Sequence, residues 1–437
     1  MTESSGEAGE DADPTGSDPA AAPRPPLWQR VAADLTPLRE SADYRRWWGG
    51  YVVSNIGSQV TIVSAQLQIF RLTHSSLYVG LTGLVTVVPL IICGLVGGSI
   101  ADAMDRRKLA LRTSSLLTIL SGLMLSQAAL HLGRLSVIYV LVGAQAGVAS
   151  IDSSARGAML PRLVRRELIP AANALGQISQ NTALTTGPLL AGLIVGTLGF
   201  PYAYGFDTIS YATILYAMYR MPPLLPEGGA ARPGLRSVGE GLRFLGPRKN
   251  LLMTFLVDIN AMVFGMPRAL FPALAANTFG GGAGTAGLLY AAPSIGALVG
   301  AGTSGWAGRI RRQGRAVLVA VGFWGASIAV FGLVHVLWIG LILLAIAGAA
   351  DMVSAIFRNT ILQVATPDSL RGRLQGVFFV VVAGGPRFGD IEAGTVASLA
   401  GTEFAVVSGG IACLVGLAAL TARFRSFAAY DARDPVP

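Results

Sequence analysis

Apolar runs of about 20 residues alternate with short polar segments along most of the chain. A helix of about 20 apolar residues spans the roughly 30 Å hydrocarbon core of a bilayer. The pattern therefore predicts an all-α membrane protein with twelve transmembrane helices. We expect these helices at about 45–70, 79–101, 110–130, 135–157, 171–196, 201–221, 250–276, 284–306, 315–333, 335–358, 374–399 and 403–422.

The composition argues against a soluble protein. Of the 437 residues, 52% are hydrophobic and only 13% are charged, whereas soluble domains carry about 25% charged residues. A soluble enzyme or a nucleic-acid binder is therefore not expected, although the net charge is +9. Arginine dominates the 33 basic residues, which is typical of a GC-rich bacterial genome, so we expect a bacterial inner-membrane protein.

The sequence carries no motif for catalysis or for a cofactor. It has no G-x-x-x-x-G-K-[ST] phosphate loop, so ATP is not expected as the energy source, and no G-x-S-x-G or H-E-x-x-H pattern. Cys93 and Cys413 lie within apolar runs, and the three histidines are too scattered to bind a metal together. We therefore expect no enzyme activity, no cofactor and no metal site.

Shifts in composition divide the chain into five predicted segments. Residues 1–26 hold six acidic residues among Gly, Ser, Ala and Pro, and such a segment buries too little apolar surface to fold. It also lacks the apolar core of a signal peptide. The predicted segments are a disordered acidic tail and lead-in (1–40), a six-helix bundle (41–221), a linker (222–249), a second six-helix bundle (250–422) and a C-terminal tail (423–437).

Basic residues are concentrated in one set of the predicted loops. That set holds 27 of the 33 Lys and Arg residues, whereas the opposite loops hold only Arg71 and Arg134. Loops rich in Lys and Arg stay in the cytoplasm. The asymmetry predicts that both termini and the linker are cytoplasmic, which requires an even number of spans.

The two predicted bundles show weak internal similarity. Residues 156–168 leave the fourth helix of the first bundle and align with residues 358–370, which leave the fourth helix of the second. Repeated six-helix halves are typical of transporters that hold a substrate near the bilayer midplane. The expected partners are therefore the lipid bilayer and a small-molecule cargo, with the protein acting as a monomer.

The loop after the second predicted helix reads GGSIADAMDRRK at 97–108 and resembles the cytoplasmic G-x-x-x-D-R-x-G-R-R loop of the major facilitator superfamily. Four positions match the motif: Gly98, Asp102, Arg106 and Arg107. Two positions depart from it: Ala103 and Asp105. The resemblance implies the major facilitator fold and a conformational latch, in which the carboxylate pairs with basic residues in one state. The alternative is ordinary flanking charge.

The fifth predicted helix carries a second motif. Its residues 186–192 read TGPLLAG and resemble the G-P-x-x-G-G core found in proton-coupled exporters of the same superfamily, with matches at Gly187, Pro188 and Gly192. Ala191 replaces the first of the paired glycines. A Gly-Pro pair lets a helix bend and pack closely, so it could seal one gate. Such pairs also occur in transmembrane helices generally, which is the alternative.

Longer stretches resemble the enterobactin-exporter branch of the superfamily, over nearly the whole chain after residue 40. The matching stretches lie at 73–81, 271–275, 287–293, 303–305, 366–368 and 372–376. The resemblance implies export of a bulky amphipathic molecule such as a siderophore by proton antiport with alternating access. Relatives in the branch include multidrug and macrolide exporters, which is the first alternative. A membrane sensor or scaffold on the same fold, without transport, is the second.

Carboxylates inside predicted spans are candidates for carrying the coupling proton, because a buried charge is costly unless it is paired or faces water. Asp390 is the first candidate, followed by Asp207 and Asp258. Asp390 lies three residues after Arg387, so the two can pair along one helix face. A structural bridge between these two residues is the alternative to a proton role.

Further ionisable pairs lie near the predicted cytoplasmic ends of two helices. Asp152 and Arg156 are four residues apart, and Asp351 and Arg358 are seven apart, so each pair shares a helix face. Together with Arg387, we expect these residues to form gating salt bridges.

Other polar residues are candidates for the wall of a cavity. The first helix carries a polar stripe that includes Asn55, Gln59 and Gln66, as well as Ser58 and Gln68. Polar groups in a membrane protein face protein or water rather than lipid, so the stripe is expected to line the cavity. Arg268, near the outer end of the seventh helix, is expected to meet an acidic cargo or to line the rim.

Overall fold

The computed structural model describes residues 34–224, 243–366 and 368–431, and this part of the chain is almost entirely helical. The helices before residue 225 are α2 (Thr36–Glu40), α3 (Ala42–Thr73), α4 (Ser76–Ala103), α5 (Arg106–Ala129), α6 (Leu135–Leu163), η1 (Arg166–Leu168), α7 (Ile169–Thr197) and α8 (Phe200–Tyr219). Those after residue 242 are α10 (Lys249–Phe264), η2 (Arg268–Leu270), α11 (Phe271–Ala273), η3 (Leu274–Thr278), α12 (Ala283–Gly302), η4 (Ser304–Arg309), α13 (Gln313–Phe331), α14 (Leu337–Val364), α15 (Asp368–Ala400), α16 (Thr402–Arg423) and α17 (Arg425–Ala428).

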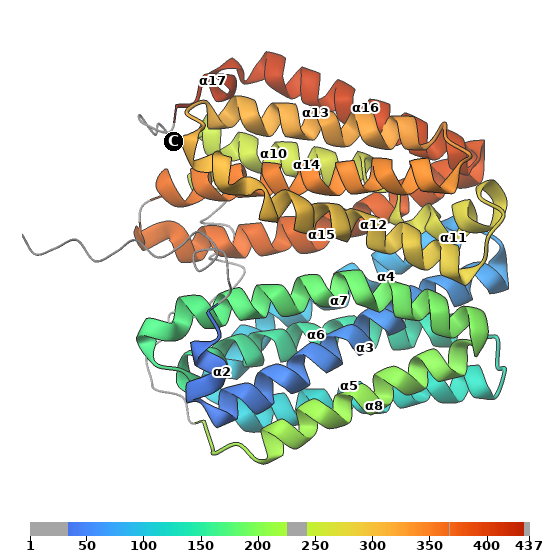
Figure 1. Cartoon of the computed structure of the whole chain (residues 1–437), viewed down its shortest axis with the longest axis vertical. Coiled ribbons are helices and arrows are strands. Elements are labelled where there is room, and N and C mark those ends of the chain that lie inside the picture. The colour runs from blue at the N-terminus through green and yellow to red at the C-terminus, as the bar shows by residue number, and fades with distance from the viewer. Residues whose placement is uncertain (1–33, 225–242, 367, 432–437) are drawn as a thin grey trace, which may run out of the picture.

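The helices form two stacked groups, which we call the first group (α2 to α8) and the second group (α10 to α17) (Figure 1). The groups meet mainly along two helix pairs, α4 with α15 and α7 with α12. Each pair joins helices that are far apart in the sequence. The contact between the groups is therefore made mainly by four helices that tertiary packing alone brings together.

Eight helical segments of the described residues are long and apolar enough to cross a membrane. The long helices α3, α7, α8 and α15 are not among them. Each of these four contributes polar or charged side chains to the wall of an internal cavity described below. Together the two sets agree with the twelve segments that the hydrophobic pattern predicts.

Local sequence accounts for several helix ends. The Ser41 hydroxyl accepts a hydrogen bond from the backbone N–H of Tyr44 at 3.1 Å and so caps α3. Asp105 caps α5 in the same way, since its carboxylate accepts from the N–H of Arg107 at 3.0 Å. Between α7 and α8, Gly199 has φ +99°, a backbone conformation that side chains disfavour. These residues permit the short turns between neighbouring long helices.

The expected seventh helix, at about 250–276, is wrong as a single helix. Helix α10 ends at Phe264, and the chain continues through η2, α11 and a π-helical turn, η3. Pro267 has no N–H to continue the helical ladder. Gly265 lies against the Trp324 indole, so a side chain at that position would collide with it. The break places Arg268 in a short 3₁₀ turn instead of on a regular helix.

The disorder expected up to residue 40 is wrong for its last five residues, which form α2. Pro37 lies in the first turn of this helix, where a missing N–H costs nothing, and its side chain is buried. The Asp34 carboxylate accepts a hydrogen bond from the N–H of Thr36 at 2.9 Å. The rest of the predicted tail, residues 1–33, lies outside the described residues, as do residues 225–242 of the predicted linker.

The two groups approach most closely at the end where α4 begins and α7 ends, which we call the closed end. A Cβ atom at Gly192 would lie 3.1 Å from the Cα atoms of Gly284 and Gly287 on α12. A Cβ atom at Gly394 on α15 would lie 3.2 Å from the Cα of Gly80 on α4. Small residues allow helix backbones this close contact, so both helix pairs are shut at the same end.

Candidate functional site

Two adjoining cavities of about 480 and 380 Å³ run through the first group. They share six lining residues, among them Ser58, Leu117 and Tyr211, and we call them together the central cavity. The larger one is lined by the first halves of α3 and α7 and lies toward the end opposite the closed end, which we call the open end. The smaller one is deeper and reaches Arg387 on α15. The central cavity thus extends from the open end to the second group.

The polar stripe of α3 faces the central cavity over most of its length. Asn55 lines the outer part, and Gln59 and Gln66 line the deeper part. Gln68 does not follow them, because it lies in the bundle interior and exchanges hydrogen bonds with Gln127 at 3.0 and 3.2 Å. The Tyr204 hydroxyl also donates to it at 2.6 Å. Its position two residues after Gln66 turns it to a different helix face.

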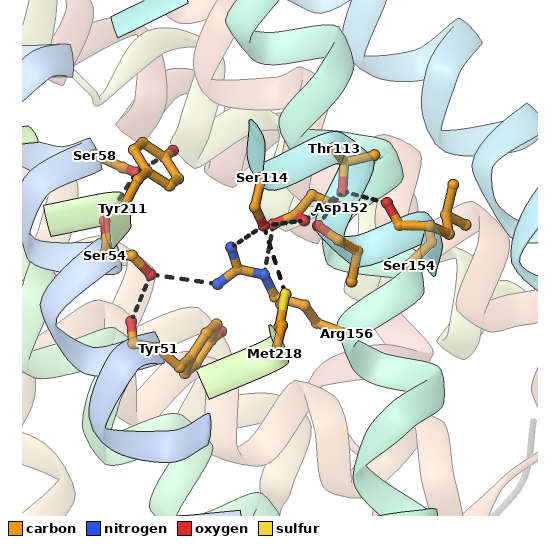
Figure 2. A network of polar contacts seen from close by, with 12 residues as sticks. Tyr51, Ser54, Ser58, Thr113, Ser114, Asp152, Ser154, Arg156, Tyr211 and Met218 are labelled. Atoms are coloured by element: carbon orange, nitrogen blue, oxygen red, sulfur yellow. Dashed lines mark hydrogen bonds and ion pairs between the residues drawn. The ribbon is translucent and has the colours of Figure 1, made fainter. Parts of the chain in front are cut away.

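The pair of Asp152 and Arg156 forms the centre of a polar network on the cavity wall (Figure 2). Arg156 Nε lies 2.5 Å from Asp152 Oδ2, and both side chains are almost fully buried. The guanidinium also donates to Ser54 on α3 at 3.3 Å and to Ser114 on α5 at 3.2 Å. The Arg156 guanidinium therefore connects α6 to both α3 and α5.

Further groups hold the same ion pair in place. Thr113 and Ser114 donate to Asp152 Oδ1 at 2.6 and 3.1 Å. The Arg156 guanidinium lies 5.5 Å from the centre of the Tyr51 ring, a cation–π distance. Tyr51 in turn stacks on Trp47 with ring centres 5.2 Å apart. The outer part of the cavity thus combines a compensated charge with aromatic surface.

Arg358 is the buried cation of the second group, and its main partner differs from the one expected. Its guanidinium forms an ion pair with Asp258 on α10, and both side chains are at most one-tenth exposed. Asp351 on the same helix as Arg358 lies 3.5 Å away and is 41% exposed. The i,i+7 pair is therefore the weaker contact, because α10 supplies a closer carboxylate. Sequence reasoning listed Asp258 only as a proton-coupling candidate.

The internal sequence repeat contains information on the contact between Arg358 and Asp258. Arg156 and Arg358 occupy aligned positions in the two halves of the chain. In the first group the arginine reaches Ser54 on α3, and in the second it reaches Asp258 on α10. Both α3 and α10 are the first long helices of their groups. A repeat alignment would therefore have predicted that Arg358 contacts α10.

Asp207 on α8 is a buried carboxylate that lines the deeper part of the central cavity. Its Oδ2 accepts hydrogen bonds from Thr61 at 2.8 Å and from Ser121 at 2.7 Å. Its Oδ1 has no hydrogen-bond partner among the described residues, and no basic side chain of that part of the chain pairs with it. Hydroxyl groups can serve either protonation state of a carboxyl, as donors or as acceptors.

Within the described residues no ion pair joins Arg387 and Asp390, the structural bridge that was the alternative to a proton role. Asp390 is buried, and its electrostatic neighbours are Arg387, Arg268 and the backbone amide of Ala269. Arg387 instead lines the central cavity. Arg268 lines a smaller cavity of about 180 Å³ between α7 and the second group. Two arginines and one carboxylate thus meet where the groups face each other.

The structure describes only part of the latch motif. Of the matching residues, Gly98 and Asp102 lie outside the described side chains. Arg106 donates to the Ala158 carbonyl on α6 at 2.9 Å, and Arg107 donates to the Met218 and Tyr219 carbonyls of α8 at 2.8 and 2.7 Å. The basic residues of the motif therefore fasten the α4–α5 loop to the ends of two other helices.

The Gly-Pro motif of α7 lies at the contact between the groups. A Cβ atom at Gly287 of α12 would clash with the Pro188 carbonyl oxygen, and one at Gly192 would meet Gly284 and Gly287. Gly187 faces the opposite way, against Gln59 of α3. The motif thus lets α7 approach α3 on one side and α12 on the other, next to the closed end.

The described residues form a two-group helical fold with a cavity open toward one end, which is the fold of the major facilitator superfamily. Solved transporters share this fold. A POT family transporter in complex with 5-aminolevulinic acid has a TM-score of 0.69 at 12% identity, over 89% of this chain and 97% of that one. A bacterial homologue of the lysosomal transporter Spinster, in an inward-facing conformation, has a TM-score of 0.66 at 14% identity, over 90% and 97%.

The family description of a transmembrane secretion effector matches residues 32–436, and the chain belongs to this family. Curated relatives align over most of their length. The chain is 31% identical to the enterobactin exporter EntS of Citrobacter koseri over 392 residues, which are 88% of this chain and 92% of that protein. It is 30% identical to EntS of Shigella boydii over 406 residues, which are 90% and 95% of the two chains. The chain is therefore a multi-pass membrane transporter, as the sequence predicts.

Proposed function

We propose that this protein exports a bulky, amphipathic, anionic small molecule of the siderophore class across the bacterial inner membrane in exchange for protons. The observation that carries the proposal is the central cavity, which extends from the open end along polar α3 to Arg387. The enterobactin exporters among the relatives support the class of cargo. The protein performs no catalysis in this proposal and acts as a monomer.

The lining of the cavity supports an aromatic, negatively charged cargo. Trp47, Tyr51 and Tyr211 offer ring surfaces in its outer part. Arg387 lies on the wall of its deeper part. Arg268 lies close enough to Arg387 to interact with it electrostatically. Arginine donates to carboxylates and to related planar anions with well-oriented N–H groups. The cargo is held between aromatic rings of the first group and arginines of the second.

Export proceeds by alternating access of two six-helix halves, with boundaries at 41–221 and 250–422 and the linker at 222–249 between them. The glycine contacts of α7 with α12 and of α4 with α15 close the outer gate in this state. The pairs Asp152–Arg156 and Asp258–Arg358 brace the inner halves of their groups, and the 98–107 motif latches the opposite state. A cavity that is open toward the cytoplasm is the state that loads an exported cargo.

Asp207 carries the coupling proton in this proposal, ahead of Asp390 and Asp258. Asp258 is neutralised by its ion pair with Arg358, and Asp390 has two arginines, Arg387 and Arg268, as electrostatic neighbours. Asp207 has only hydroxyl partners among the described residues and lines the cavity. A proton can therefore reach it through the cavity, and its protonation changes the charge of the site.

The orientation is tested by reporter fusions. Fusions after residue 230 and at the C-terminus are both expected to report a cytoplasmic location, because basic residues are concentrated at that end of the chain's helices. A fusion in the predicted outer loop near Arg134 serves as the control and should report the periplasm. A periplasmic signal from either of the first two fusions would contradict the proposed orientation.

The cargo is tested by transport into everted membrane vesicles. Enterobactin is expected to accumulate in a proton-gradient-dependent way, and Arg268→Gln/Arg387→Gln is expected to lower its uptake about tenfold or more, since a charged hydrogen bond contributes about 1.5–3 kcal/mol. Arg309→Gln, on the exposed surface, is the matched control. Uptake of an uncharged macrolide in place of enterobactin would favour a drug exporter, and no gradient-driven uptake of either would favour a sensor or scaffold.

A further inference from the structure

A lateral groove of about 610 Å³ lies on the second group, where α12, α13 and α14 pack side by side. It shares no lining residue with the central cavity. Its more buried lining includes five small residues, Gly300, Ala316, Ala320, Ala349 and Ala350, as well as Ile310 and Val353. Large apolar residues stand exposed beside them: Val299, Val319, Phe323 and Ile346. Small residues at the bottom and large ones at the sides give the groove its depth.

One end of the groove is polar. Trp306, Arg312 and Arg315 lie there, and the rest of the lining is almost entirely apolar. Both arginines are exposed, and neither side chain forms a hydrogen bond or an ion pair with another described residue. The neighbouring Arg311 differs, because it pairs with Asp431 at 3.2 Å. Two uncompensated cations three residues apart therefore stand at the mouth of an apolar groove.

This arrangement matches the two parts of a membrane lipid. Arginine side chains near the membrane surface attract acidic headgroups, and tryptophan prefers the boundary between headgroups and hydrocarbon. Phe323 lies eight residues beyond Arg315 on α13, about 12 Å along the helix at 1.5 Å per residue. The apolar part of the groove thus runs from the arginines toward the hydrocarbon core, as an acyl chain does. A soluble anion would leave this apolar part unfilled.

We propose that the groove binds one anionic phospholipid. Its phosphate contacts Arg312 and Arg315, and one acyl chain lies along Val319, Phe323 and Ile346. The site is separate from the cargo site, because none of its lining residues, Arg312 and Arg315 included, lines the central cavity.

Native mass spectrometry of the full-length protein, released from detergent in the presence of phosphatidylglycerol, tests the proposal. The wild-type protein is expected to retain one phosphatidylglycerol and to prefer it over phosphatidylcholine. Arg312→Gln/Arg315→Gln is expected to raise the apparent Kd for phosphatidylglycerol about tenfold or more. The matched control Arg309→Gln/Arg311→Gln removes the same charge from the same end, outside the groove lining, and is expected to bind as the wild type does.

A second variant separates the acyl chain from the headgroup. Val319→Trp fills the groove from an exposed position, so the fold is kept, and it is expected to lower the binding of both lipids. Equal loss of phosphatidylglycerol in both double variants would overturn the proposal, because the effect would then follow net charge. Displacement of the lipid by glycerol phosphate would overturn it in favour of a simple anion site. A dimer that Val319→Trp disrupts would overturn it in favour of a second chain.

Discussion

Asp207→Asn is expected to abolish proton-driven export while the protein stays folded and still binds its cargo. Asparagine keeps the size of the side chain, and its oxygen can still accept the hydrogen bonds from Thr61 and Ser121. It cannot change charge, so the exchange of a proton for cargo loses its carrier. Cargo is then expected to equilibrate across the membrane without accumulating against its gradient.

The measurement is enterobactin uptake into everted vesicles, with and without an imposed proton gradient, together with cargo binding to the purified protein. Asp390→Asn is the matched control, since it is an equally buried carboxylate at the interface of the groups. It is expected to weaken cargo binding through the neighbouring arginines and to keep the response to the gradient. Normal gradient-driven uptake by Asp207→Asn would contradict the assignment, and the loss of coupling in Asp390→Asn alone would make Asp390 the proton carrier.

Arg358→Gln is expected to destabilise the folded protein by about 3–5 kcal/mol, the cost of breaking a buried ion pair from one side. The change leaves the Asp258 carboxylate buried without its cation. Replacing both partners removes the uncompensated charge, so Asp258→Asn/Arg358→Gln is expected to recover most of the stability. A thermal-unfolding midpoint of detergent-solubilised protein measures the difference.

Asp351→Asn is the matched control for this experiment. Asp351 contacts the same guanidinium at 3.5 Å but is 41% exposed, so its loss is expected to cost less than about 1 kcal/mol. If the double variant is as unstable as Arg358→Gln, the charge of Asp258 is not the cause, and the packing of the long arginine side chain is. If Asp351→Asn is the more damaging change, the dominant partner of Arg358 is the one on its own helix.

The two aligned arginines show how one repeat position can serve two environments. Arg156 is surrounded by one carboxylate and several hydroxyl groups on the wall of the central cavity. Arg358 is held between two carboxylates, Asp258 near the middle of α10 and Asp351 near the middle of α14. In the first group, the wall of the central cavity is therefore polar, and the charge of Arg156 in it is compensated by Asp152. The second group presents its free cations elsewhere, at Arg268 and Arg387.

The sequence by itself determined the class of protein and most of the helices. Apolar runs long enough to span a bilayer, and too few charges for a soluble surface, permit little else. The loop motif at 97–108 and the Gly-Pro motif at 186–192 indicated the superfamily that the whole-chain comparison then bore out. These signals are local, because each depends on a few neighbouring residues or on the length of one run.

Tertiary structure decided which polar residues meet. Helical periodicity placed Arg387 beside Asp390 and Asp351 beside Arg358 on the same helix. It carries no information on which residues of other helices contact them. Tertiary packing pairs Asp258 with Arg358, surrounds Asp207 with hydroxyl groups, and brings Gln127 to Gln68. A buried charge takes the nearest compensating group in space, whatever its distance in sequence. For that reason the cavity, its cations and the lateral groove became visible only when the helices were assembled.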